Sequence, residues 1–189
     1  MNTEKKLNQE TKSEAEYILR KFSVNDINSI TKHANNINIA KWLTDEFPHP
    51  YYKKDAESFI NMVSNENPTT TFAIEVNGEA SGAIAITPPE EDKGTESMDT
   101  VINACDKKAE LGYWLAEDYW DRGIISSAIK EIVEYGFETF DIDCIFATPF
   151  IENIASQKVL KKAGFKTDSE IRKILKNNIS YEVFIFKIK

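Results

Sequence analysis

The stretch ELGYWLAEDYWDRGIISSA, from Glu110 to Ala128, decides the fold. Its first six residues predict a strand, an acidic and aromatic turn follows, and Gly123 opens a long helix with periodic apolar residues. The first four amides of a helix have no partner inside it, so a helix that begins at a glycine beside a strand end can bind an anion. Residues 122–127 are therefore a candidate phosphate cradle, with an ordinary strand-turn-helix connection as the structural alternative.

The surrounding elements predict an α/β (α+β) domain with a mixed sheet and helices on both faces. A strand at 110–115, a helix from Ile124 to Phe140 and a strand at 144–148 make a right-handed βαβ unit whose strands are parallel. Asn77-Gly78 predicts a hairpin, because both residues tolerate positive φ. The other expected elements are strands at 17–22, 69–76, 79–87, 165–171 and 180–187, and helices at 27–34, 37–43, 55–63 and 153–163.

Length and composition predict one domain. The chain has 189 residues, of which 41% are hydrophobic, which is enough for a substantial core. Residues 1–15 are polar and lack periodicity, so we expect a flexible tail followed by a single domain over 16–189. Residues 88–108 are acidic and irregular, and we expect them to form a long loop with a short helix near Val101.

Charge and residue counts exclude several classes of protein. A net charge of −8 without a basic stripe argues against nucleic acid as the partner. The sequence has no apolar run long enough to span a membrane and no signal peptide, so we expect a cytoplasmic protein. Two histidines and no Cys/His cluster predict no metal site. Cys105 and Cys144 lie in dissimilar contexts, which predicts two free thiols.

A second motif makes a family resemblance specific. Residues 153–165 read NIASQKVLKKAGF, and together with GYWLAEDYWDRGIISSAIK at 112–130 and FPHPY at 47–51 they resemble the RimJ/RimL-like branch of the GNAT superfamily of N-acetyltransferases. The resemblance extends over residues 17–188. It implies the GNAT acyl-CoA N-acyltransferase fold, with a mostly antiparallel sheet in which two parallel strands splay apart. It also implies acetyl-CoA as the acyl donor.

The resemblance places acetyl-CoA against the strand that ends at Leu115, with its pyrophosphate at the N-terminus of the next helix. Arg122 would pair with the pyrophosphate. Asp121 replaces a frequent glycine and Ile125 a small residue, so both are expected to weaken binding. Alternatively, Asp121 is a simple helix N-cap. The cofactor-binding residues that the resemblance implies are Trp114, Leu115, Arg122, Gly123, Ile124, Ile125, Ser126, Ser127, Asn153 and Ser156.

The chemistry that the resemblance implies is direct attack of a neutral amine on the thioester in a ternary complex. Glu110 is the candidate base, acting directly or through water, with a solvated strand-end carboxylate as the alternative. A backbone amide near Trp114 or Leu115 would stabilise the oxyanion. Ser156 would protonate the leaving thiolate, since no tyrosine follows it one turn later. The alternatives are a helix N-cap for Asn153 and a polar first-turn residue for Ser156.

The acceptor site is expected near FPHPYY, with His49, Tyr51 and Tyr52 as substrate-binding residues and the acidic 88–108 loop as a second wall. Aromatic packing on the core is the alternative for the tyrosines. The resulting prediction is a cytoplasmic acetyl-CoA-dependent N-acetyltransferase that modifies a protein N-terminal amine. Three alternatives stay open: a small-molecule amine as acceptor, an inactive acyl-CoA-binding protein and a scaffold. Assembly as a homodimer is open as well.

Overall fold

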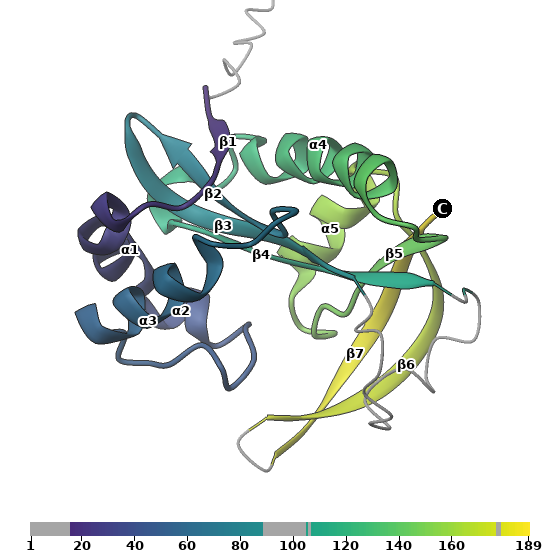
Figure 1. Ribbon diagram of the computed structural model, residues 1–189. Helices are drawn as coiled ribbons and strands as arrows, with labels where there is room; N and C mark the ends of the chain where they lie inside the picture. Colours follow the sequence, from purple (N-terminus) through teal and green to yellow (C-terminus); the bar gives the residue numbers. More distant parts are fainter. Residues whose placement is uncertain (1–15, 89–104, 106, 177–178) are drawn as a thin grey trace, which may run out of the picture.

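The computed structural model describes residues 16–88, 105, 107–176 and 179–189, which form a seven-stranded sheet with helices on both faces (Figure 1). The strand order is β1-β2-β3-β4-β5-β7-β6. Only β4 and β5 are parallel among these neighbours. The strands are β1 (Ile18–Arg20), β2 (Thr71–Val76), β3 (Glu79–Thr87), β4 (Lys108–Leu115), β5 (Cys144–Ala147), β6 (Lys166–Lys176) and β7 (Ile179–Ile188).

Two groups of helices cover opposite faces of the sheet. The α-helices are α1 (Ile27–Ala34), α2 (Ile37–Ala40), α3 (Lys53–Val63), α4 (Ile124–Thr139) and α5 (Ile154–Lys162). One core cluster joins β2–β5 to α4 and α5, and a second joins β2 and β3 to α1 and α3. Figure 1 shows α1–α3 gathered beside β1–β4 and α4 along the other side of the sheet. No helix among the described residues is long and apolar enough to cross a membrane.

Local sequence signals fixed most element boundaries correctly. Asn77 and Gly78 have φ values of 53° and 81°, as the predicted hairpin turn requires. The predicted parallel βαβ unit is confirmed by the pairing of β4 with β5. Several elements differ in length. β1 has three residues where six were expected, α2 ends three residues earlier, α3 and β4 each begin two residues earlier, and β6 runs five residues further. β6 extends because β7 pairs with it as far as Lys176, and that pairing is a tertiary contact without a local signal.

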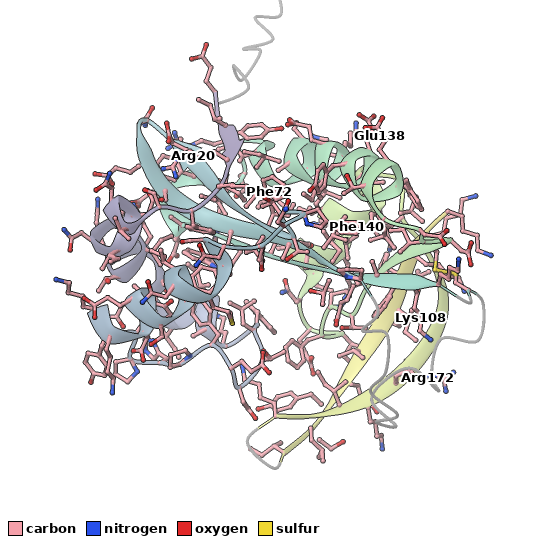
Figure 2. The ribbon with its side chains drawn as sticks, in the orientation of Figure 1. Arg20, Phe72, Lys108, Glu138, Phe140 and Arg172 are labelled. Carbon is pink, nitrogen blue, oxygen red and sulfur yellow. A yellow bond between two sulfur atoms is a disulfide. The ribbon has the colours of Figure 1, made fainter. Side chains whose placement is uncertain are left out.

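The prediction of two free thiols is wrong, because Cys105 and Cys144 form a disulfide (Figure 2, yellow bond). The two Cα atoms lie 6.2 Å apart although the residues are 39 positions apart in sequence. The parallel register sets Lys108 opposite Cys144, so the residues just before β4 reach the first residue of β5. The residues around each cysteine in the sequence do not indicate the register of β4 against β5.

Several predictions fall on residues outside the described ranges. These are the tail at 1–15, the short helix near Val101 and most of the acidic 88–108 loop. They stay predictions.

Candidate active site

The parallel strands β4 and β5 pair along only part of their length. The paired residues on β4 are Lys108, Ala109 and Glu110, whereas β4 continues to Leu115. On its other side β4 is paired with β3 over its whole outer part, from Glu110 to Leu115. The pairing of the two strands therefore ends at Glu110 and Phe146, as the predicted splay requires. We call the region between residues 111–115 of β4 and the residues that follow β5 the wedge.

Backbone amides of β4 face this wedge. The amide of Ala116 donates to the carbonyl of Ser81 in β3. Because successive residues of a strand direct their amides to opposite edges, the amides of Tyr113 and Leu115 face away from β3 and into the wedge. The carbonyl of Leu115 accepts a 2.7 Å hydrogen bond from the indole nitrogen of Trp120. The Leu115 amide therefore suits the predicted oxyanion role, whereas the amide of Trp114 is directed toward β3.

Gly123 begins α4 at the end of this wedge. It occupies the N-cap position with a φ of 82°, in the left-handed region that favours glycine. No side chain caps the helix from this position, so its first-turn amides are available to an anion. Ile124 and Ser126 point into the core, while Ile125 and Ser127 are half-buried. The alternative that Asp121 is the N-cap is not supported, since it lies two residues before Gly123 and has a φ of 59°.

Arg122 is exposed and bound to its own turn. Its Nη2 donates to the carbonyl of Asp118 at 2.7 Å, and its guanidinium lies over the ring of Tyr119. It is therefore close to the α4 N-terminus but already hydrogen-bonded. Pairing with a pyrophosphate stays a prediction, and it requires only that this exposed side chain exchange one carbonyl contact for an anionic one.

The N-terminus of α5 has a side-chain cap, unlike that of α4. Asn153 is the N-cap, and its Oδ1 accepts from the amide of Ser156 at 3.1 Å. The helix N-cap alternative for Asn153 is thus confirmed, and a role with pantetheine stays a prediction. Across the wedge, the hydroxyl of Tyr113 on β4 lies 2.7 Å from Ser156 Oγ. Sequence reasoning missed Tyr113, because only the tertiary fold brings the two residues together.

Glu110 lies where β4 and β5 begin to separate. Its carboxylate is half-buried and accepts a 3.2 Å hydrogen bond from Thr148 Oγ1. Burial raises its pKa above the ordinary 4.5; the Thr148 hydrogen bond opposes this shift and the negative charge of Glu46 adds to it. The alternative of a fully solvated carboxylate is therefore not supported. A buried carboxyl with a raised pKa is a feature of general bases.

The segment after α2 lies against β4, and its role as an acceptor site stays a prediction. Phe47 packs edge-on against Trp114, with ring centroids 5.8 Å apart, and the charge of Glu46 acts on Glu110. Of the three predicted acceptor residues, His49 and Tyr52 are exposed, and the Tyr52 amide contacts Asp55 in the first turn of α3. Tyr51 is buried in the core beside Phe47, in the packing role that was the alternative.

The β6–β7 hairpin also reaches this side of the molecule. Lys176 near its tip donates to the carbonyl of Ala40 at the end of α2, at 3.0 Å. Its ammonium lies over the ring of Phe150. The Phe150 ring packs beside the rings of Trp42 and Tyr181, with centroid distances of 6.2 and 5.2 Å. Burial lowers the pKa of Lys176. These aromatic residues come from three distant segments, so no local motif could have identified the cluster.

The geometry fits acetyl-CoA better than a metal ion. The described residues contain no group of three or more His, Cys, Asp or Glu side chains that could hold a metal. In contrast, the wedge offers strand amides to a pantetheine arm and the α4 amides to a pyrophosphate. Glu110 lies at the point where the strands part, and the Tyr113–Ser156 pair lies beyond it.

Residues 17–166 match the family model of the acetyltransferase (GNAT) domain, so the chain belongs to the GNAT acetyltransferase family. This family comprises acetyl-CoA-dependent N-acetyltransferases. Among curated proteins, the uncharacterized N-acetyltransferase YoaA of Bacillus subtilis (strain 168) is 31% identical over 83 residues, 43% of this chain and 47% of YoaA. The match thus spans about half the length of that relative.

Solved structures share the fold. Mycobacterium smegmatis RimJ in complex with CoA-disulfide superimposes with a TM-score of 0.72 at 20% identity, covering 91% of this chain and 81% of RimJ. A spermidine N-acetyltransferase from Vibrio cholerae in complex with CoA and spermine superimposes with a TM-score of 0.66 at 19% identity, covering 91% of this chain and 94% of the other. The GNAT fold and the RimJ/RimL-like resemblance are confirmed.

Proposed function

We propose that this chain transfers the acetyl group of acetyl-CoA to a protein N-terminal α-amine. The observation that carries the proposal is Glu110, a half-buried carboxyl with a raised pKa at the point where β4 and β5 separate. The negative charge of Glu46, beside the segment expected to bind the acceptor, also raises the pKa of Glu110. A base is needed because only the neutral amine attacks a thioester.

The energetics of deprotonation favour an α-amine over a lysine-like amine. An unperturbed α-ammonium has a pKa of about 8, so its neutral form costs about 1.4 kcal/mol at pH 7. A primary alkylamine such as the lysine ε-amine has a pKa of about 10.4, which corresponds to about 4.6 kcal/mol. A carboxylate whose pKa is raised only by burial and a neighbouring charge accepts a proton more readily from the α-ammonium. RimL, a ribosomal L7/L12 alpha-N-protein acetyltransferase, has a solved structure with the same fold, which supports this acceptor class.

Each residue near the wedge then has one task. Bound acetyl-CoA supplies the activated acetyl group and a thiol leaving group. Glu110 removes a proton from the amine, directly or through water. The Leu115 amide stabilises negative charge on the acetyl oxygen. Ser156 donates its hydroxyl proton to the departing sulfur, and the N-terminus of α4 after Gly123 holds the pyrophosphate, with Arg122 beside it.

A polyamine is the second candidate acceptor. Glu46 gives the acceptor side a second carboxylate near Glu110, which would attract a polycation. The Vibrio cholerae relative was solved with spermine, so the same fold can bind such a molecule. The difference between the two candidates is charge: a polyamine carries several cationic groups, and an N-terminal peptide carries one α-ammonium followed by a backbone.

A thiol-release assay with acetyl-CoA tests the proposal. Acceptors would be N-terminal peptides with free and with blocked α-amines, and spermidine and spermine at equal concentration. We expect release with the free peptides, no release with blocked peptides that retain an internal lysine, and acetylation at the N-terminus by mass spectrometry. Faster turnover of the polyamines would favour the second candidate. Acetyl-CoA binding without release would favour an acyl-CoA-binding protein, and absence of binding would favour a scaffold.

We further propose a cytoplasmic location, as the sequence predicts. Disulfides are rare in reducing compartments, so this location predicts that Cys105 and Cys144 are mostly thiols inside the cell. Alkylation of the protein in intact cells, before lysis, would reveal the pair as modified thiols. Assembly as a homodimer is a separate prediction, which light scattering of the purified protein would check.

A further inference from the structure

We propose that Tyr113 is a positioning residue for acetyl transfer, which holds the Ser156 hydroxyl with its proton directed toward the leaving sulfur. The inference rests on the proposed function, because it assigns a task to a residue beside the same wedge. Neither the family match nor the sequence motifs assign Tyr113 any role.

The geometry holds Ser156 from two sides. Tyr113 belongs to the part of β4 that no longer pairs with β5, and its hydroxyl reaches across to α5, 2.7 Å from Ser156 Oγ. The backbone of Ser156 is fixed separately, since its amide donates to Asn153 Oδ1 at 3.1 Å. With both its backbone and its hydroxyl oxygen engaged, the remaining freedom of Ser156 is the direction of its one proton.

The chemistry of the two hydroxyls sets that direction. Either group can donate in a serine–tyrosine pair, and a phenol is the more acidic of the two. Burial raises the pKa of Tyr113 to about 12, so its proton stays in place at neutral pH and is available for the hydrogen bond. When Tyr113 donates to Ser156 Oγ, the serine proton points away from Tyr113. We place this proton toward the wedge, where the thioester would lie.

The proton balance of the transfer is then complete. The bond between the amine nitrogen and the acetyl carbon forms, and the carbon–sulfur bond breaks with its electron pair on sulfur. Ser156 gives its proton to that sulfur, while Tyr113 keeps its own proton and its hydrogen bond to Ser156 Oγ. The attacking nitrogen loses two protons between ammonium and amide, both through Glu110: the first passes to bulk water before attack, and the second returns through water to Ser156. No oxidant, reductant or metal is required.

A purely structural role is the competing explanation, because the same hydrogen bond would also tie α5 to β4. Tyr113→Phe removes the hydroxyl and keeps the ring. Tyr135→Phe is a matched control, since the Tyr135 hydroxyl also makes one 2.7 Å hydrogen bond, to the carbonyl of Thr69. Tyr135 packs between Phe72 and Phe140, both labelled in Figure 2, with ring centroids 5.1 and 6.1 Å away.

The test measures kcat and KM for both substrates in five proteins: wild type, Y113F, S156A, the Y113F/S156A double variant and the control Y135F. We expect Y113F to lower kcat about tenfold, part of the 10²–10⁴ that general acid catalysis contributes, with both KM values within about twofold of wild type. S156A should lower kcat at least as much, and the double variant should be no slower than S156A. Y135F should retain the wild-type kcat.

Three results would overturn the inference. They are an unchanged kcat in Y113F, additive losses in the double variant, or a raised KM for acetyl-CoA at unchanged kcat, which indicates a structural role. If Y113F does not fold, 3-fluorotyrosine at position 113 preserves the shape and lowers the phenol pKa. The kcat should then begin to fall at a lower pH than in wild type, and an unshifted pH profile of kcat would contradict the inference. Failure of the proposed function is distinct, because wild type itself would release no thiol.

Discussion

The two ends of the β4–β5 pair differ in how they use their backbone and side chains. At the closed end, residues 108–110 pair with 144–146 and the Cys105–Cys144 disulfide joins the strands. At the open end, residues 111–115 do not pair with β5, and α4, the next α-helix along the chain, follows a glycine that provides no side-chain cap. The closed end satisfies its hydrogen bonds internally, whereas the open end keeps amides for a ligand. Glu110 is the last paired residue and lies at the boundary.

The two helix N-termini at the open end differ in the same way. Asn153 caps α5 with its side chain and fixes Ser156, while Gly123 leaves the amides of α4 available. A capped terminus holds a side chain still, and an uncapped terminus can bind an anion. We therefore expect the closed end to provide stability and the open end to provide ligand affinity. Four experiments test this difference.

The largest expected effect concerns the closed end. Cys105→Ser should lower the free energy of unfolding by about 4 kcal/mol, from the entropy of a loop that the disulfide closes over 39 residues. Urea unfolding with and without reductant measures it. Reductant should bring wild type to the level of the variant and leave the variant unchanged. Equal stability of oxidised and reduced wild type would show that the closed end does not depend on this bond.

The next largest effect is expected at Glu110, the last residue of β4 that pairs with β5. Glu110→Gln keeps the oxygen that accepts from Thr148 but cannot accept a proton, so kcat should fall about 100-fold. Because the folded pKa of Glu110 is raised, the folded state binds more protons than the unfolded state between pH 4.5 and the raised value. Wild-type stability should therefore fall as pH rises through this window, and E110Q should remove that dependence.

Two measurements check this variant, the pH profile of kcat and urea unfolding at several pH values. Glu138→Gln is the control, an exposed carboxyl on α4 that is labelled in Figure 2. It should change neither quantity. E110Q with wild-type activity would remove Glu110 as the base.

A smaller effect is expected at the start of α4. Gly123 and Gly78 have φ values of 82° and 81°, and an added Cβ would meet nothing within 4 Å at either position. Both Gly→Ala variants should lose about 1–2 kcal/mol of stability, because the left-handed conformation disfavours a Cβ. Only G123A should weaken acetyl-CoA binding, by about tenfold in calorimetry, since it strains the amides that would hold the phosphate. Equal affinities in the two variants would refute the cradle.

The smallest effect is a gain. Asp121 has a φ of 59° and a negative charge close to the α4 N-terminus. Asp121→Gly should tighten acetyl-CoA binding about two- to fivefold, because charge near a helix terminus is worth about 0.3–1 kcal/mol. Asp121→Asn removes only the charge, so comparing the two variants by calorimetry separates charge from backbone conformation. Equal or weaker binding by D121G would show that Asp121 does not limit affinity.

Much of the fold could be predicted because its signals are local. Alternation predicted β3 with the bounds that the structure has, and Asn77-Gly78 predicted the turn before it. Gly123 and Asn153 were placed at helix starts because glycine and asparagine favour those positions. The family motifs then placed Glu110 and Ser156 near one wedge, and the structure does bring both beside the separation of β4 and β5.

The sequence by itself determined the elements, the parallel βαβ unit and the candidate residues, because backbone propensities and apolar periodicity act over a few neighbouring residues. Only the tertiary structure decided which side chains meet. It paired Cys105 with Cys144, Tyr113 with Ser156, and Lys176 with the end of α2. Each contact joins segments at least 39 positions apart, so it follows from strand register and packing, which no local pattern encodes.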